Sequence, residues 1–285
     1  RRDWAAGDAV RDAGLTEPAG VEQFKNLSYG PYGEANLLDV FRPEDRKGEV
    51  LPVIVNIHGG GFFYGDKELY RFYCLHLAEF GFAVVSFNYR LSPEWHFPAP
   101  LEDTLAVMNW IGAHASEYGL DPKQVFLTGD SAGAELSAHY ACIATDPSFA
   151  TAFGFVPPAS VQIRGVSLAC GLYDLVGEIG KTDEFVPNYL GDGIPDDDPR
   201  LMLPDHVTDA FPPAYVFSSV NDFLHDACEP FARLIMDRGG YAESRIYGTK
   251  EETEVSHVFH LNMRLPIGEE ANRDQIAFFR KLLEV

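Results

Sequence analysis

The sequence lacks three features that would assign its class at once, namely a cysteine cluster, a basic run and a long apolar segment. Its four cysteines are far apart in the chain, without a CxxC spacing or adjacent histidines. They are Cys74, Cys142, Cys170 and Cys228. This spacing argues against a zinc knuckle or a redox pair, so we expect buried free thiols and no bound metal.

No segment approaches the roughly 20 apolar residues of a membrane helix. The chain begins RRDWAAGDAV, without the apolar stretch of a signal peptide. We therefore expect a soluble, cytoplasmic protein with no membrane partner. The first residue is Arg1 rather than Met, which leaves a removed upstream segment open.

Positive charge is scarce: 22 Lys and Arg stand against 43 Asp and Glu, a formal net charge of −21. Such a chain repels phosphate backbones and anionic surfaces, and it contains no basic run of five residues. We expect no nucleic-acid partner. We also expect anionic substrates to be disfavoured.

The 285 residues are 46% hydrophobic, which excludes a disordered chain and suits one large core. Short apolar runs alternate with stretches that carry apolar residues three or four apart, and this alternation predicts a mostly parallel sheet flanked by helices. The strand-length runs lie at 53–57, 82–87, 124–128, 161–169, 214–218 and 241–247. The helical stretches lie at 68–80, 101–117 and 132–145. We expect one α/β domain over residues 1–285.

Two segments depart from this alternation. Residues 1–22 show weak periodicity, and 174–210 are rich in Gly, Pro and Asp, so we expect both to form a small cap or lid over the site. A plain surface excursion is the alternative for 174–210. Residues 26–30 and 37–41 predict an antiparallel pair that opens the sheet. An exposed last strand at 241–247 could pair with its copy in a homodimer.

The first chemical motif is GDSAG at 129–133, between a predicted strand and a predicted helix. Glycines at both ends permit a sharp turn that exposes the Ser131 hydroxyl in front of a helix N-terminus. Ser131 is therefore the candidate nucleophile.

The second motif is HGGGF at 58–62, directly after a predicted strand. Adjacent glycines let a backbone approach a ligand and direct N–H groups at it, as an oxyanion hole requires. We expect the backbone N–H groups of Gly60, Gly61 and Ala132 to be its donors. His58 is expected to brace the loop through a hydrogen bond rather than to act as a base.

A seryl nucleophile needs a base, and the chain has nine histidines. Six lie in predicted helices, upstream loops or the insertion, which leaves His225, His257 and His260. Where a serine follows a strand in such a turn, the acid and then the base follow it in chain order, after late strands. The segment 250–260 follows the last strand, so we favour His257, with His260 as the alternative.

The acid is expected after the strand at 214–218. Asp222 lies nearer the strand end than Asp226, and a carboxylate there could hold the imidazole tautomer and stabilise the imidazolium. Asp226 is the alternative, but it is better placed to cap the helix predicted near Ala227. We favour Asp222.

These motifs occur together with four others, and the combination resembles the hormone-sensitive-lipase-like branch of the α/β-hydrolases. The others are YRLSPE at 89–94, FPAPLED at 97–103, NDFLHD at 221–226 and SHVFH at 256–260. Within that branch the chain is similar to bacterial carboxylesterases and acetyl esterases. The resemblance implies a Ser131, Asp222 and His257 triad, no cofactor, and hydrolysis of small-molecule esters with short acyl chains, from acetyl to butyryl.

The chain departs from these relatives at two positions beside the triad. Phe223 stands where many carry proline after the aspartate, and Val258 where many carry glycine after the histidine. Both can reshape the pocket. Four aromatic residues close to the motifs are expected to narrow the acyl pocket, although core packing is the other interpretation. They are Phe62, Phe63, Tyr64 and Phe97.

Two rival functions use the same sequence features. The triad could cleave an amide, as in an aryl formamidase, because this fold supports both reactions. A catalytically inactive hydrolase fold could instead serve as a binding module, which a complete Ser131, Asp222 and His257 set argues against. Because of the acidic charge, we expect neutral esters to be preferred to dianionic ones.

Overall fold

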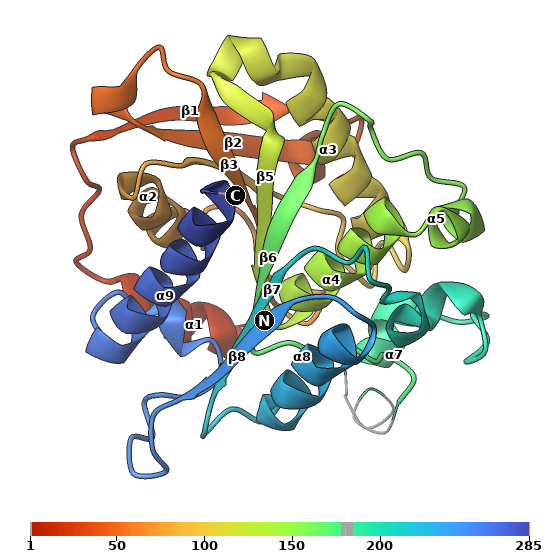
Figure 1. Ribbon diagram of the computed structural model, residues 1–285. Coiled ribbons are helices and arrows are strands. Elements are labelled where there is room, and N and C mark those ends of the chain that lie inside the picture. The colour runs from red at the N-terminus through yellow and green to blue at the C-terminus, as the bar shows by residue number, and fades with distance from the viewer. Residues whose placement is uncertain (1, 178–179, 181–184, 285) are drawn as a thin grey trace.

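The computed structural model describes residues 2–177, 180 and 185–284. Its centre is an eight-stranded sheet with the strand order β1-β2-β4-β3-β5-β6-β7-β8 (Figure 1). The strands are β1 (Val21–Ser28), β2 (Leu37–Pro43), β3 (Leu51–Ile57), β4 (Ala83–Phe87), β5 (Leu120–Asp130), β6 (Ile163–Ala169), β7 (Ala214–Ser219) and β8 (Ala242–Tyr247). The β1–β2 and β2–β4 pairs are antiparallel, and the remaining pairs are parallel.

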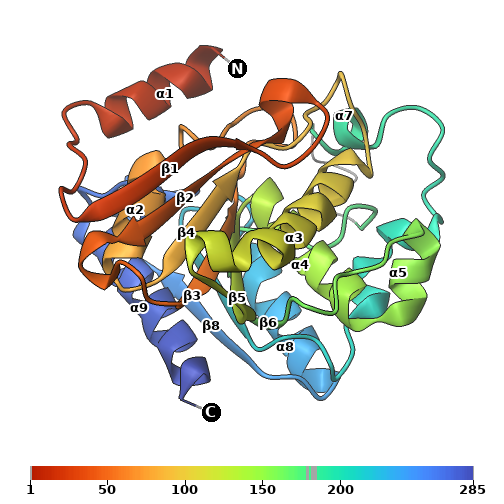
Figure 2. The ribbon, with the colours of Figure 1, turned by 90° about the horizontal axis from the view of Figure 1, so that it is seen from above.

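Helices cover both faces of this sheet, because the central strands are apolar on both sides. The helices named below are α1 (Arg2–Asp12), α2 (Arg71–Glu79), α3 (Ala99–Tyr118), α4 (Ala132–Thr145), α5 (Pro147–Phe153), α7 (Val186–Leu190), α8 (Cys228–Asp237) and α9 (Pro266–Leu283). Helices α2 and α9 lie on one face, and α3, α4 and α8 lie on the other (Figures 1 and 2). The core accordingly forms two clusters of buried side chains, one on each side of the sheet.

Most of the elements predicted from the sequence are present, but the N-terminal region differs. Strand β1 begins at Val21, earlier than the predicted 26–30, and α1 forms where only weak periodicity was visible. None of the side chains of α1 is buried. The helix therefore lacks the apolar stripe by which a helix is recognised in a sequence.

Strand register brings the motifs to one edge of the sheet. Ile57 of β3 pairs with Gly129 of β5, so the glycine loop and the serine turn begin side by side. A parallel bridge joins Asn221 to Ser256, which places the loops after β7 and β8 next to each other. Because the carboxyl ends of parallel strands share one edge, residues from four loops meet there.

The last strand, β8, lies at the edge of the sheet as expected. Pairing of two copies along it stays a prediction. Among the described residues, no helix has both the length and the apolar character needed to span a bilayer.

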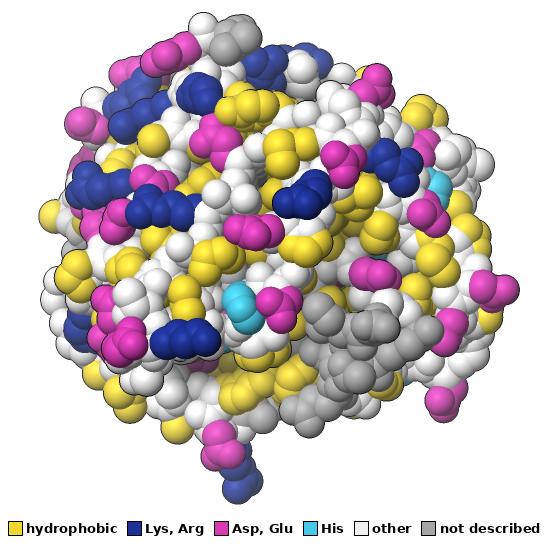
Figure 3. Space-filling model, turned by 60° about the horizontal axis from the view of Figure 1, so that its bottom comes forward, with side chains coloured by type: hydrophobic (Ala, Val, Ile, Leu, Met, Phe, Trp, Pro, Cys, Tyr) yellow, Lys and Arg dark blue, Asp and Glu magenta, His cyan; other side chains and the backbone are white. Residues whose placement is uncertain are grey.

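The net charge of −21 does not give every face of the molecule one sign. On the face in Figure 3, acidic and basic side chains are interspersed with hydrophobic ones. The overall charge thus does not fix the local potential on this face, and the exclusion of anionic substrates stays a prediction.

Candidate active site

Ser131 lies in a strained turn between β5 and α4. Its φ of 53° and ψ of −120° are unusual for a residue with a side chain. The flanking glycines permit the turn by their lack of a side chain. A Cβ on Gly129 would lie 2.2 Å from the carbonyl oxygen of Gly133, and one on Gly133 would lie 2.0 Å from that of Ile57. The spacing GxSxG is therefore required by backbone contact on both sides of the serine.

The glycine loop after β3 is held in a conformation that only glycine tolerates. Gly60 has a φ of +115°, and a Cβ there would lie 1.9 Å from the carbonyl oxygen of Tyr64. The Tyr64 N–H in turn donates to the Gly60 carbonyl at 2.9 Å. Among the described residues, the backbone N–H groups of Gly60, Gly61 and Ala132 donate no hydrogen bond to a protein acceptor. These three donors are thus available to a substrate oxygen.

His58 supports this loop from behind. Its Nδ1 donates to the carbonyl oxygen of Gly59 at 2.7 Å, and its ring stacks on Tyr89 with 4.1 Å between centroids. Burial lowers the pKa of His58 to about 4, so the imidazole is neutral at physiological pH. This geometry agrees with the bracing role expected from the sequence.

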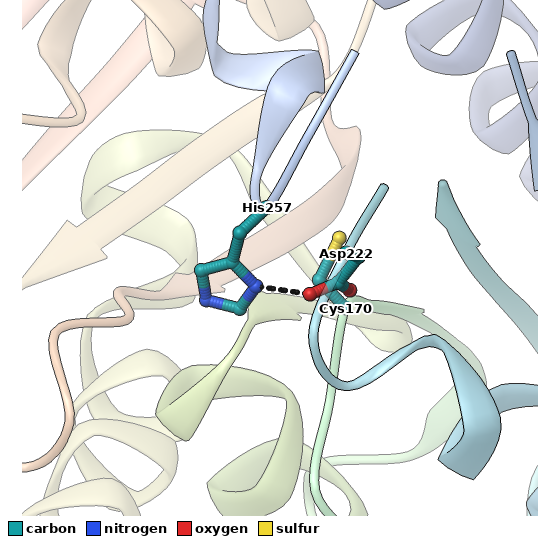
Figure 4. Close-up of side chains that lie close together, drawn as sticks. All are labelled: Cys170, Asp222 and His257. Carbon is teal, nitrogen blue, oxygen red and sulfur yellow. Dashed lines mark hydrogen bonds and ion pairs between the residues drawn. The ribbon is translucent and has the colours of Figure 1, made fainter. Parts of the chain in front are cut away.

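His257 and Asp222 form a short acid–base pair (Figure 4). His257 Nδ1 donates to Asp222 Oδ1 at 2.7 Å, and the carboxylate also accepts from Ser218 Oγ and from the Leu224 N–H. Burial alone would raise the pKa of Asp222, but the hydrogen bond and charge of His257 and the other donors hold it below its ordinary value. Asp222 is therefore ionised and fixes the His257 tautomer with a free Nε2.

Ser131 and His257 line the same cavity but share no hydrogen bond in the described structure. Such contacts are commonly long in a ligand-free site and shorten when the substrate binds. The arrangement thus places the predicted nucleophile, base and oxyanion donors around one cavity, with the predicted acid bonded to the base behind it.

The alternative base and acid lie elsewhere. His260 is buried, and burial lowers its pKa to about 3, so it cannot reach a substrate or carry a proton near neutral pH. The side chain of Asp226 is 82% exposed and pairs with His225, and neither residue lines the cavity. The structure therefore favours the choice of His257 and Asp222 made from the sequence.

Asp130 adds a second buried carboxyl group behind the glycine loop. It accepts a hydrogen bond from Tyr70 Oη at 2.8 Å, and the same Tyr70 oxygen accepts the Gly59 N–H at 2.9 Å. Burial raises the pKa of Asp130 to about 6. This chain of contacts ties the loop to the residue that precedes the nucleophile.

The cavity has a volume of about 320 Å³ and mostly apolar walls. Phe62 and Tyr64 line it as predicted, but the prediction was wrong for two other aromatic residues. Phe63 packs outside the wall, where its ring stacks on that of Phe185 at 5.1 Å. Phe97 belongs to the core.

Phe97 is 5% exposed, and its ring contacts His139, Phe153 and Tyr189 at 5.7–6.0 Å. It lies two residues before α3, and its side chain packs against the helices α4 and α5 instead of lining the cavity. Nearness to a motif in sequence therefore did not predict the direction of this side chain.

The structure also places residues at the cavity that the sequence did not single out. Trp4 of α1 lines it and contacts the rings of Phe63 and Phe185 at 5.0 and 5.3 Å. Asp8 of α1 accepts a hydrogen bond from Tyr64 Oη at 2.7 Å. No sequence signal pointed to them, because α1 contributes no buried residue to the core.

One cluster of described residues has the composition of a metal site. The ligand atoms of Cys170, Asp222 and His257 lie within 4.8 Å of one another (Figure 4). However, burial raises the pKa of the Cys170 thiol well above its ordinary value, and His257 Nδ1 is occupied by its bond to Asp222. The cluster therefore fits a catalytic pair with a neutral thiol beside it better than a metal centre.

The model of the α/β-hydrolase-fold family matches residues 54–261, and the chain belongs to this family. Similar proteins include two of Mycobacterium tuberculosis, the probable carboxylic ester hydrolase LipM and the esterase LipQ. LipM is 37% identical over 52% of this chain and LipQ 29% over 84%. These alignments span 34% of LipM and 57% of LipQ, so the chain matches only part of each.

Among solved structures, esterase B from Lactobacillus rhamnosis superposes with a TM-score of 0.89 and 26% identity, over 99% of this chain and 92% of that one. The predicted fold and the predicted esterase branch of the family are confirmed by these matches. They also support the prediction of an enzyme with carboxylesterase activity.

Proposed function

We propose that this protein is a serine carboxylic ester hydrolase. The observation that carries the proposal is the convergence of Ser131, the 2.7 Å Asp222–His257 pair and three unused backbone N–H groups on one cavity. A binding module has no need of a strained serine next to a fixed imidazole.

In the proposed reaction, His257 Nε2 takes the Ser131 proton while Oγ attacks the ester carbonyl carbon. The carbonyl oxygen becomes an oxyanion that accepts hydrogen bonds from Gly60, Gly61 and Ala132. The alcohol leaves with the proton returned by His257, which gives an acyl-enzyme. Water then attacks the acyl group with the same base, and Ser131 is released.

We assign acyl groups from acetyl to butyryl to this site. The cavity of about 320 Å³ is lined by the rings of Trp4, Phe62 and Phe185, and a volume of this size suits a short acyl chain. The related esterase B of Lactobacillus rhamnosis was solved after inhibition by a tributyrin phosphonate. A series of p-nitrophenyl esters from C2 to C12 tests this assignment, and best turnover at C8 or longer would contradict it.

We further propose that the N-terminal segment 1–22 is a lid on a single domain, helped by the described parts of 174–210. Its helix α1 is attached by the Trp4 ring contacts and by Arg11, which donates to the Leu69 carbonyl oxygen at 2.9 Å. Residues 178–179 and 181–184 of the predicted insertion lie outside the described residues.

Replacement of the nucleophile is the direct test of the proposed function. Ser131→Ala should reduce turnover of p-nitrophenyl acetate at least a hundredfold, because the remaining groups cannot form the acyl-enzyme. The exposed Ser160→Ala is the control and should keep wild-type activity. Circular dichroism should show both variants folded. Retention of more than a hundredth of the activity by Ser131→Ala would refute the proposal.

A further inference from the structure

Phe223 is the large apolar side chain that the fold leaves most exposed at the cavity. It is 65% exposed although it immediately follows the buried Asp222. Its side chain lines the cavity, and its ring lies 4.3 Å from the His257 ring, tilted by 40°. No other ring contact of Phe223 is present among the described residues. One face of this phenyl ring is therefore open at the site.

The position of Phe223 identifies the part of the substrate that it meets. During acylation, His257 Nε2 must lie within hydrogen-bond reach of the ester oxygen that joins the alcohol to the acyl group. The carbonyl oxygen is directed away from His257, toward the glycine loop. A ring packed against His257 is thus next to the first atoms of the alcohol and not next to the acyl chain.

The other exposed aromatic residue among those lining the cavity has different neighbours. Trp4 is 39% exposed and packs on Phe63 and Phe185, next to the glycine loop. It has no ring contact with His257 in the described structure. The two residues therefore offer a matched comparison, in which only Phe223 borders the catalytic base.

From this geometry we propose that Phe223 is a specificity-determining residue that selects esters of flat, aromatic alcohols. The open face of Phe223 stacks on the ring of the alcohol while His257 protonates its oxygen. Aromatic pairs of this kind prefer offset or tilted stacking and are more favourable than contact with a saturated ring of equal size. The proposal rests on the proposed ester hydrolase function and adds the class of alcohol.

The reaction for such a substrate balances without a further reactant. For benzyl acetate, the bond from Ser131 Oγ to the acetyl carbon forms and the bond from that carbon to the benzyl oxygen breaks. The serine proton passes through His257 to the benzyl oxygen, and benzyl alcohol leaves. Water then releases acetate and restores Ser131.

The test compares benzyl acetate with cyclohexylmethyl acetate, two esters of equal carbon skeleton whose alcohols differ in flatness and aromaticity. The kcat/KM ratio of the two is measured for wild type, Phe223→Leu, Phe223→Trp and the matched control Trp4→Leu. We expect Phe223→Leu to lower the benzyl-to-cyclohexylmethyl ratio about three- to tenfold. Phe223→Trp should retain the wild-type ratio, and Trp4→Leu should stay within twofold of it.

Two outcomes would overturn the proposal. One is an unchanged ratio in Phe223→Leu; if both esters then lose activity equally with a displaced pH profile, Phe223 only shields His257 from water. The other is an equal change of the ratio in Trp4→Leu. Absence of hydrolysis of every ester by the wild type would instead refute the proposed function itself.

Discussion

One carboxylate–histidine pair lies at the cavity and another of the same length lies in the core. In both the Asp222–His257 and the Glu135–His139 pair, Nδ1 lies 2.7 Å from a carboxylate oxygen. The side chain of His257 is 24% exposed and lines the cavity, whereas both side chains of the second pair are fully buried within α4. A short acid–histidine contact therefore does not by itself mark a catalytic site.

The surroundings of Nε2 in each imidazole distinguish the two pairs. His257 Nε2 is free to exchange a proton with Ser131 and substrate in the cavity. His139 Nε2 is buried without a partner among the described residues, and so is Glu135 Oε2. The second pair satisfies only His139 Nδ1 and Glu135 Oε1, and neither residue lines the cavity, so it has no route to a substrate. We expect the first pair to control rate and the second to control stability.

The largest expected effect comes from the catalytic acid. Asp222→Asn should lower kcat for p-nitrophenyl acetate roughly a thousand- to ten-thousandfold, because the amide no longer holds the correct tautomer or stabilises the imidazolium. The exposed Asp226→Asn is the control and should stay within twofold of wild type. Steady-state kinetics measure both variants. A loss smaller than tenfold for Asp222→Asn would remove the distinction between the two pairs.

Replacement of one residue of the buried pair should lower the stability of the fold and leave the catalytic rate nearly unchanged. Glu135→Ala leaves His139 without a partner in the core, so the free energy of unfolding should fall by about 3–5 kcal/mol. Urea unfolding measures the loss. The rate per active site, counted with a fluorophosphonate probe, should remain within threefold of wild type.

A double replacement provides the control for this result. Glu135→Leu with His139→Leu removes both polar groups and should recover most of the lost stability, because no buried charge remains unpaired. If Glu135→Ala lowered the rate per active site more than tenfold, the division between a catalytic pair and a structural pair would be wrong.

Asp130 extends the comparison to a buried carboxyl group without a histidine. Because its pKa is raised from 3.8 to about 6, the folded state binds its proton more tightly than the unfolded state does. The free energy of unfolding therefore falls as the pH rises between these values, and the cost of the ionised group persists above pH 6. From pH 5 to pH 8 this loss is about 1.4 kcal/mol.

The variant Asp130→Asn keeps an oxygen that accepts from Tyr70 and removes the titration. Its free energy of unfolding relative to wild type should thus be about 1.4 kcal/mol more favourable at pH 8 than at pH 5. Urea unfolding at the two pH values measures this difference. The same relative stability at both would show that Asp130 does not titrate in this range.

The motifs in the sequence predicted the backbone conformation around the candidate site. The backbone conformations of GDSAG and HGGGF can be predicted from the motifs themselves. The contacts that forbid a Cβ at Gly129 and Gly60 come from residues only a few positions further along the chain. The choice of His257 over His260 was also reached from chain order. Burial supplied the physical reason, because His260 faces the core.

The sequence motifs did not predict which side chains line the cavity or that the N-terminal helix contributes to it. Phe97 and Phe63 lie close to the motifs in sequence but do not line the cavity. Trp4 and Phe223 reach it from an N-terminal helix without buried residues and from a loop. Which wall a ring forms depends on how distant elements pack, and that information is not local.

The four scattered cysteines illustrate the difference between what the sequence determines and what the tertiary structure decides. The sequence by itself determined that they form no cluster along the chain, and all four are buried free thiols in the structure. Only the tertiary structure decided that Cys170 lies beside Asp222 and His257. Local backbone contacts fix the serine turn and the glycine loop, but β6, β7 and the loop after β8 meet only when the parallel sheet has formed.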